Sequence, residues 1–139
     1  MEESASEVSP TEERANGEIR AEISRRMVQF HKDFYGKGPE KAKTYYHDDS
    51  VLILLRGGFT KVEETLLEAG HGGAVIGQRM KFQEVMQGRF AEMISEVTGR
   101  RVIAFMSGSY QRPDIISEIF ILEPSDLIPE SEQNLSSES

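Results

Sequence analysis

Ser50 to Arg56 reads SVLILLR, and this stretch decides the fold. Its five central residues are apolar without a polar break. Such a run predicts a strand that is buried on both faces, unlike the alternating pattern of a half-solvated strand. A second strand is expected at 41–46, joined to the first by a polar turn at 47–49. Gly57 and Gly58 end the apolar strand. The two strands and the turn between them predict an antiparallel hairpin at 41–56.

A helix is predicted before this hairpin. Apolar residues recur there every three or four positions and form one stripe: Ile19, Ile23, Met27, Phe30 and Phe34. Two starts are possible, either at Ser9 and Pro10 with Glu12 as a capping acid, or at Asn16, and Gly17 favours the later one. Gly36 is expected to end the helix, with Pro39 beyond it.

The second half begins with a T-x-x-E capping box. Thr60 and Glu63 have the spacing that starts a helix, which should run to about Ala69. Gly70, Gly72 and Gly73 interrupt it. A long helix is expected over 74–98 and closed by Gly99, followed by a hairpin of strands at 102–110 and 115–122.

The predicted order is helix, strand, strand, helix, helix, strand, strand (αββααββ). The simplest architecture is an α+β fold of two layers, with a four-stranded, mostly antiparallel sheet and the helices on one face. The apolar content of the strands then requires a cover on the other face. A second copy of the chain is the expected cover, because two-fold dimers are the commonest oligomers, and we predict a homodimer.

Charge is distributed unevenly along the 139 residues. The formal net charge is -8, but residues 1–13 and 124–139 are acidic and contain no Lys or Arg, whereas the middle is nearly neutral. The composition of these two segments predicts disordered acidic tails at 1–13 and 124–139, on either side of a single domain at 14–123. The domain lacks the basicity that nucleic-acid binding usually needs. The chain has no cysteine, and neither a signal peptide nor a membrane span is evident, so we expect a cytoplasmic protein.

Several short motifs occur in a fixed order over about the whole ordered part. They are Gly36-Lys37-Gly38-Pro39, Asp48-Asp49, Gly57-Gly58-Phe59-Thr60 with Glu63 and Glu64 before Leu66, Arg79, Thr98-Gly99-Arg100-Arg101-Val102, and Glu118-Ile119-Phe120-Ile121-Leu122-Glu123. In this set the chain resembles the MpsC family, formerly a domain of unknown function and named after a sodium-translocating, membrane-potential-generating system. The resemblance implies an accessory or regulatory protein that is associated with membrane ion or bicarbonate transport, and it supplies no catalytic residues.

The leading hypothesis is therefore a non-enzymatic accessory protein that acts through protein–protein contact. We expect no cofactor, no metal site and no catalytic residue. The binding candidates are Arg79, Thr60, Glu63, Gly70, Gly72 and Gly73. Arg79 either forms an ion pair with Glu63 or Glu64 or holds an anion.

Two alternatives remain open. The G-x-x-G of residues 70–73 between two helices is typical of a KH-like module that binds single-stranded nucleic acid. The acids of the preceding helix and the absence of Lys or Arg in the loop disfavour it. The other alternative is a small-ligand sensor, which requires a closed pocket near Arg79.

Overall fold

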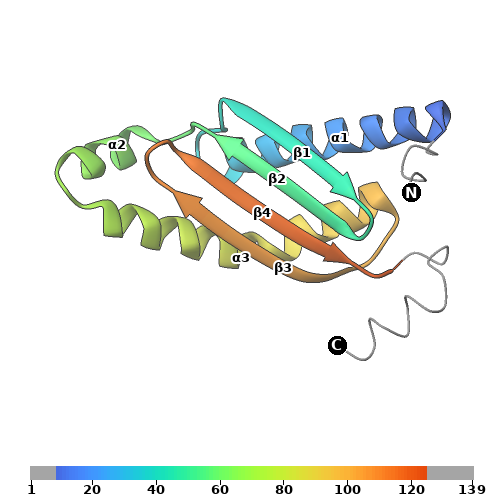
Figure 1. Ribbon diagram of the computed structural model, residues 1–139. Coiled ribbons are helices and arrows are strands. Elements are labelled where there is room, and N and C mark those ends of the chain that lie inside the picture. The colour runs from blue at the N-terminus through green and yellow to red at the C-terminus, as the bar shows by residue number, and fades with distance from the viewer. Residues whose placement is uncertain (1–8, 125–139) are drawn as a thin grey trace, which may run out of the picture.

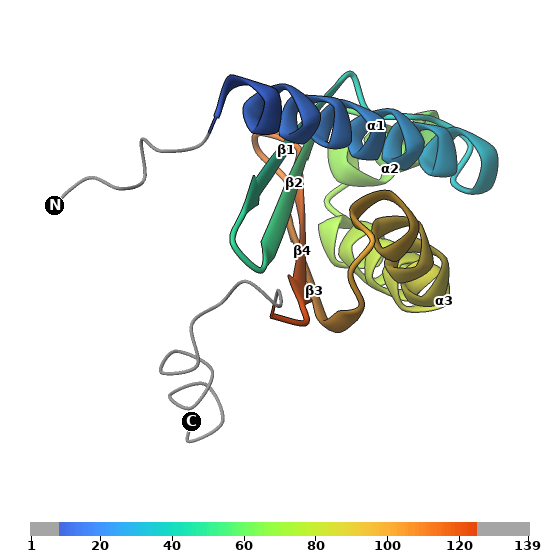
Figure 2. The same cartoon turned by 90° about the vertical axis from the view of Figure 1, so that its right-hand side faces the viewer.

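The computed structural model describes residues 9–124 as two layers, a sheet with helices on one of its faces (Figures 1 and 2). The elements in chain order are α1 (Pro10–Phe34), β1 (Lys41–His47), β2 (Ser50–Arg56), α2 (Lys61–Glu68), α3 (Gly72–Thr98), β3 (Val102–Tyr110) and β4 (Ile115–Leu122). The predicted order and the α+β class are confirmed. The ranges predicted for β2, β3 and β4 are those observed.

The sheet has the order β1-β2-β4-β3, and all of its neighbouring strands are antiparallel. The two hairpins therefore meet through β2 and β4, the central strands. Ile53 of β2 is paired with Glu118 of β4, which is in turn paired with Ser107 of β3. This register places residues of distant parts of the chain next to one another on each face.

The hydrophobic core lies between the helices and the inner face of the sheet. Ile23 and Met27 of α1, Phe90 of α3 and Phe120 of β4 are fully buried. The stripe predicted for the first helix thus faces the core at its center, and its last residue, Phe34, is half exposed. Phe90 also contacts Phe105 of β3, with ring centroids 6.4 Å apart.

The two faces of β2 differ, which corrects the prediction of a strand buried on both faces. Val51, Ile53 and Leu55 point inward and are at most 1% exposed, whereas Leu52 and Leu54 on the outer face are only partly buried. The helices pack on one face alone, as the edge-on view shows (Figure 2). Within one chain, the outer face of the described strands has no helix over it.

The first helix begins at the earlier of the two predicted starts. Ser9 is the N-cap, and its hydroxyl accepts a hydrogen bond of 3.0 Å from the backbone N–H of Glu12. The favoured later start at Asn16 is wrong, since the cap and Pro10 outweigh the helix-weakening effect of Gly17. Residues 10–13, assigned above to the acidic tail, therefore belong to α1, while residues 1–8 and 125–139 of the predicted tails lie outside the described residues.

The long helix also starts earlier than predicted, at Gly72 instead of residue 74. Gly99 closes it in the left-handed conformation, with φ of 72°, as expected. No helix within residues 9–124 combines the length and the apolar character needed to cross a membrane.

Candidate functional site

Glu63 occupies the first turn of α2 and forms the predicted capping box with Thr60. The backbone N–H of Glu63 donates to the Thr60 hydroxyl at 3.1 Å, and the backbone N–H of Thr60 donates to Oε1 of Glu63 at 2.9 Å. The cap fixes the carboxylate where α2 approaches α3. Glu63 is consequently buried, although its neighbour Glu64 is exposed.

Arg79 reaches this carboxylate from α3. Its Nε donates to Oε2 of Glu63 at 3.0 Å and its Nη2 to Oε1 at 3.3 Å, a two-point contact that suits the planar guanidinium. The predicted pairing of Arg79 with Glu63 is present, and Glu64 takes no part in it. The Arg79 side chain is 4% exposed, so the pair is largely shielded from water.

A second carboxylate completes the arrangement and was not foreseen from the sequence. Nη1 of Arg79 donates to Oδ1 of Asp114 at 2.7 Å, and the Asp114 side chain is 8% exposed. Asp114 lies in the turn between β3 and β4, 35 residues beyond Arg79, so no local spacing rule could join them. Arg79, Glu63 and Asp114 are called the ion triad below.

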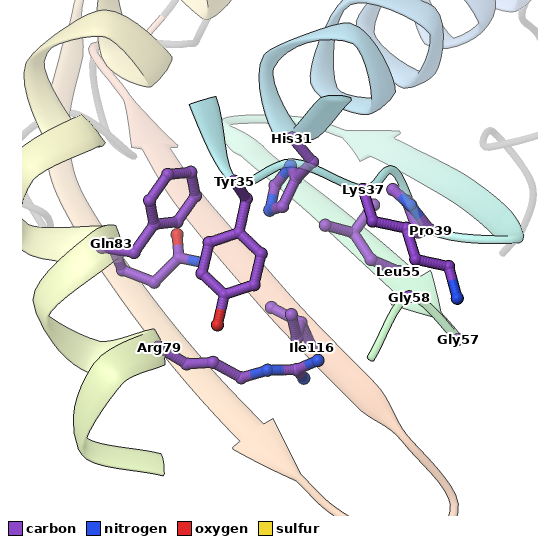
Figure 3. Close-up of a pocket in the computed structure, with 11 residues that line it drawn as sticks. His31, Tyr35, Lys37, Pro39, Leu55, Gly57, Gly58, Arg79, Gln83 and Ile116 are labelled. Carbon is purple, nitrogen blue, oxygen red and sulfur yellow. The ribbon is translucent and has the colours of Figure 1, made fainter. Parts of the chain in front are cut away.

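Aromatic side chains close the ion triad. The Phe59 ring centroid lies 4.2 Å from Cζ of Arg79, in cation–π contact. The Tyr35 hydroxyl donates to Oε2 of Glu63 and accepts from Nε2 of Gln78 at 3.1 Å. Tyr35 and Arg79 line a small cavity (Figure 3), whose volume of about 10 Å³ leaves room for about one water molecule.

The electrostatics of the ion triad are those of a satisfied structural network. Burial acts to raise the pKa of Glu63, but hydrogen bonds from Arg79, Tyr35 and Thr60 outweigh it and leave that pKa lowered. Burial acts to lower the pKa of Arg79, and the two carboxylates reverse this effect and raise it. With two acids around one base, the guanidinium has no spare positive charge for an anion. The geometry favours the structural ion pair over an anion site.

The glycine loop has a structural explanation of its own. Gly70 adopts φ of +84°, and the N–H groups of Gly70 and His71 donate to the carbonyls of Leu67 and Leu66, a Schellman motif that ends α2. The Gly72 carbonyl accepts from Nε2 of Gln111 at 2.9 Å. Gly73 has open space around it. The loop contains no Lys or Arg, and the KH-like alternative stays untested.

A different feature lies on the outer face of the sheet. The pairing register aligns four apolar side chains, one from each strand, in a row across the sheet: Tyr45, Leu52, Ile119 and Met106. We call this the apolar row. It is flanked on the same face by Leu54, Ile115, Ile121, Ala104 and Tyr110.

Charge on this outer face is of one sign. Lys41, Lys43 and Arg56 gather at one corner, at the start of β1 and the end of β2, and none of the four strands places an acidic side chain on the outer face. Contiguous apolar surface of this kind is typical of an interaction site. The sequence signalled it only through the excess of apolar residues in β2 and β4.

No group of three or more His, Asp or Glu side chains within residues 9–124 is arranged to hold a metal ion. The ion triad contains two carboxylates, but both are directed at Arg79.

The model of the family described as "Na+-translocating membrane potential-generating system (MpsC)" matches residues 15–124. The chain belongs to the MpsC family. MpsC relatives include the uncharacterized protein YbcI of Bacillus subtilis (strain 168), which is 29% identical over 93 residues, or 66% of this chain and 75% of YbcI. No solved structure matches the chain. The resemblance noted in the sequence is thus confirmed, and the family's name links it to a membrane-potential system.

Proposed function

We propose that this MpsC protein is a non-enzymatic accessory or regulatory protein of a membrane ion-transport system, and that it acts as a homodimer joined through the apolar row. The single observation that carries this proposal is the uncovered row of Tyr45, Leu52, Ile119 and Met106. The link to ion transport is supported by the family's name. The non-enzymatic part is supported by the ion triad, whose charged groups are engaged with one another.

A second copy suits this face because the sheet is close to self-complementary. Rotation by 180° about an axis parallel to the strands, through the space between β2 and β4, places β1 over β3 of the partner. Tyr45 then faces Met106, and Leu52 faces Ile119. Lys41 then faces Tyr110 and Arg56 faces Ile115, so no cationic side chain is stacked directly on its own copy.

The size of the face sets the expected strength of the dimer. Four strands about 4.8 Å apart and seven residues long give a face of roughly 19 by 23 Å. This is small for a permanent dimer, and specific interfaces of modest area are commonly reversible. We therefore expect a dimer that dissociates on dilution.

The oligomeric test compares two substitutions of exposed apolar residues by lysine. Met106 lies in the apolar row and is 51% exposed, whereas Val62 lies on α2 and is 63% exposed. In sedimentation equilibrium, Met106→Lys should weaken the dimer at least about tenfold, because an apolar contact of the row becomes a buried charge. Val62→Lys should behave as wild type. A wild-type protein that stays monomeric at about 100 µM, above the dissociation constant of a reversible dimer, would refute the proposal.

The functional test uses the same pair of variants in cells. A strain lacking this gene is complemented with the wild type, Met106→Lys or Val62→Lys, and membrane potential is measured with a potential-sensitive dye in sodium-containing medium. We expect rescue by the wild type and Val62→Lys only. Full rescue by a monomeric Met106→Lys would show that the function does not require the dimer. An unchanged membrane potential in the deletion strain would contradict the transport role.

A further inference from the structure

The two edge strands of the sheet differ in how they are protected against pairing with a further strand. β1 carries Lys41 and Lys43, and the hydroxyl of its Thr44 is hydrogen-bonded at 2.7 Å to that of Ser24 on α1. Charged residues and a covering helix are the usual protection of an edge strand. β3 forms the other edge (Figure 1) and runs for nine residues without Lys, Arg, Asp, Glu or Pro.

The backbone of β3 is regular along most of its length. Its pairing with β4 is irregular only between Val102 and Ala104, and from there to Tyr110 the register is continuous. An irregularity at the start of the strand leaves the rest of the free edge able to pair. β3 therefore offers an uncharged and regular edge over residues 104–110.

An open cleft of about 220 Å³ lies beside this edge, between α3 and β3. Phe105, Ser107 and Ser109 belong to its sheet side, and they are alternate residues on the inner face of β3. Ser107 and Ser109 are exposed, although they point to the face that carries the helices. Neighbouring strands share their faces, so a strand added to β3 would direct every second side chain into this cleft.

The helix side of the cleft presents accessible side chains. Met80 is 60% exposed, and Glu84 and Gln87 are also exposed. Methionine adapts to apolar groups of different shape, and the amide of Gln87 can both donate and accept hydrogen bonds. These residues suit the side chains of a peptide strand.

The charge at the cleft is negative. Glu84 lines it and is exposed. Arg79 lines it too, but its guanidinium is held by Glu63 and Asp114, so the carboxylates of the ion triad outnumber its one cation. A partner with Lys or Arg on the cleft side is favoured over an acidic one.

A second copy of the chain fits this edge less well than a separate peptide does. Pairing of β3 with β3 of another copy about a two-fold axis would bring the two Glu84 side chains toward that axis. β3 contains no Lys or Arg that could balance them. The charge of the cleft therefore points to a different, cationic chain.

We propose that the free edge of β3 binds an extended segment of a partner protein by strand addition, with alternate side chains in the cleft and a Lys or Arg of the segment beside Glu84. Main-chain hydrogen bonds to β3 supply the affinity, and the cleft selects the side chains. This inference rests on the proposed action through protein–protein contact. It does not depend on the dimer, because the apolar row lies on the opposite face of the sheet.

The test is an NMR titration of the isotope-labelled full chain with the acetylated and amidated peptide KTVTKTVTK. As a strand, this probe places its lysines and valines on one face. It should shift the backbone amide signals of residues 104–110 and leave those of β1 in place. Because main-chain contacts supply the affinity, a generic strand is a valid probe.

Two matched peptides separate charge from strand formation. ETVTETVTE reverses the charge and should bind at least about threefold more weakly, because its acids meet Glu84. KTVPKPVTK keeps the lysines and valines on the same positions, but its prolines prevent strand pairing. It should not bind.

Two variants of α3 provide the matched protein controls. Glu84→Lys changes an exposed residue, so it should fold, bind KTVTKTVTK at least about threefold more weakly and bind ETVTETVTE more tightly. Glu92→Lys makes the same change at an exposed position outside the cleft and should bind both peptides as the wild type does.

Four outcomes would overturn the proposal. They are the absence of shifts in β3 with KTVTKTVTK up to about 1 mM, equal binding of the proline peptide, an unchanged affinity in Glu84→Lys, and self-association through β3. The last is detected without peptide in Met106→Lys, whose outer-face dimer is weakened. Shifts at 104–110 that grow with the concentration of this variant would assign the edge to a second copy.

The dimer, the transport role and the β3 edge have separate readouts. A monomeric wild-type protein that binds KTVTKTVTK would refute the dimer alone. A dimer that does not bind the peptide would refute the β3 site alone. An unchanged membrane potential in the deletion strain would contradict the transport role and leave the result of the titration standing.

Discussion

Glu118→Gln makes a prediction about stability, because Glu118 is a fully buried acid on the inner face of β4. Burial raises the pKa of Glu118 from 4.5 to about 8, although the nearby Ser107 hydroxyl opposes the rise. Below about pH 4.5 the carboxyl is neutral in both the folded and the unfolded protein and has no effect. Between pH 4.5 and about pH 8 the Glu118 carboxyl is ionised in the unfolded chain and neutral in the folded protein, so the free energy of unfolding falls as pH rises.

The magnitude follows from the distance between the two pKa values. A difference from 4.5 to about 8 corresponds to about 5 kcal/mol at about 1.4 kcal/mol per pH unit, and roughly 3 kcal/mol of it is lost by pH 7. Glutamine resembles the neutral acid. Its free energy of unfolding should be close to that of the wild type near pH 5 and higher by several kcal/mol near pH 9.

The assay is urea unfolding followed by circular dichroism at several pH values and at constant ionic strength. The measured quantity is the difference in the free energy of unfolding between the wild type and Glu118→Gln at each pH. Other titrations, such as that of His31, whose pKa is lowered by burial, occur in both proteins and cancel. Glu84→Gln, which removes an exposed carboxylate of α3, should give a curve parallel to the wild type. Parallel curves for Glu118→Gln would refute the reasoning.

Two further pairs of substitutions, each a test and its control, examine the local structure. Arg79→Met should destabilise the fold by about 3 to 5 kcal/mol in urea unfolding, because it leaves two buried carboxylates without a partner. The control, Glu64→Gln, should cost less than about 0.5 kcal/mol. A small loss of stability in Arg79→Met would contradict the ion triad. Gly70→Ala should lower stability by about 1 to 2 kcal/mol, because the backbone of Gly70 has φ of +84°. The control, Gly73→Ala, adds a methyl group in open space within α3 and should be neutral or stabilising. Equal effects in the two variants would show that the Schellman geometry does not matter for stability.

Much of the fold was predictable because its signals are local. The Thr60–Glu63 spacing and the left-handed glycines mark helix ends through hydrogen bonds between near neighbours. The apolar runs of β2 and β4 define strands by composition. The start of α1 was harder, because two local signals competed, and the Ser9 cap with Pro10 prevailed over Gly17.

The ion triad was only half predictable. Glu63 and Arg79 were both candidates, and the capping box restricted where Glu63 could lie. Asp114 was missed, since it reaches Arg79 only after β3 and β4 have paired with the rest of the sheet. Contacts that depend on strand order have no signature in residue spacing.

Glu118 differs from Asp114, because the sequence did contain a signal for it. In β4 the residues Ile116, Phe120 and Leu122 share one face, and the period of two places Glu118 on that face with them. A lone acid in phase with buried apolar residues is expected to lie in the core. Burial of this acid lowers stability at neutral pH, so packing alone does not explain its presence there. The alternation that identifies a strand's buried face therefore also identifies the side chain whose chemistry the packing leaves unexplained.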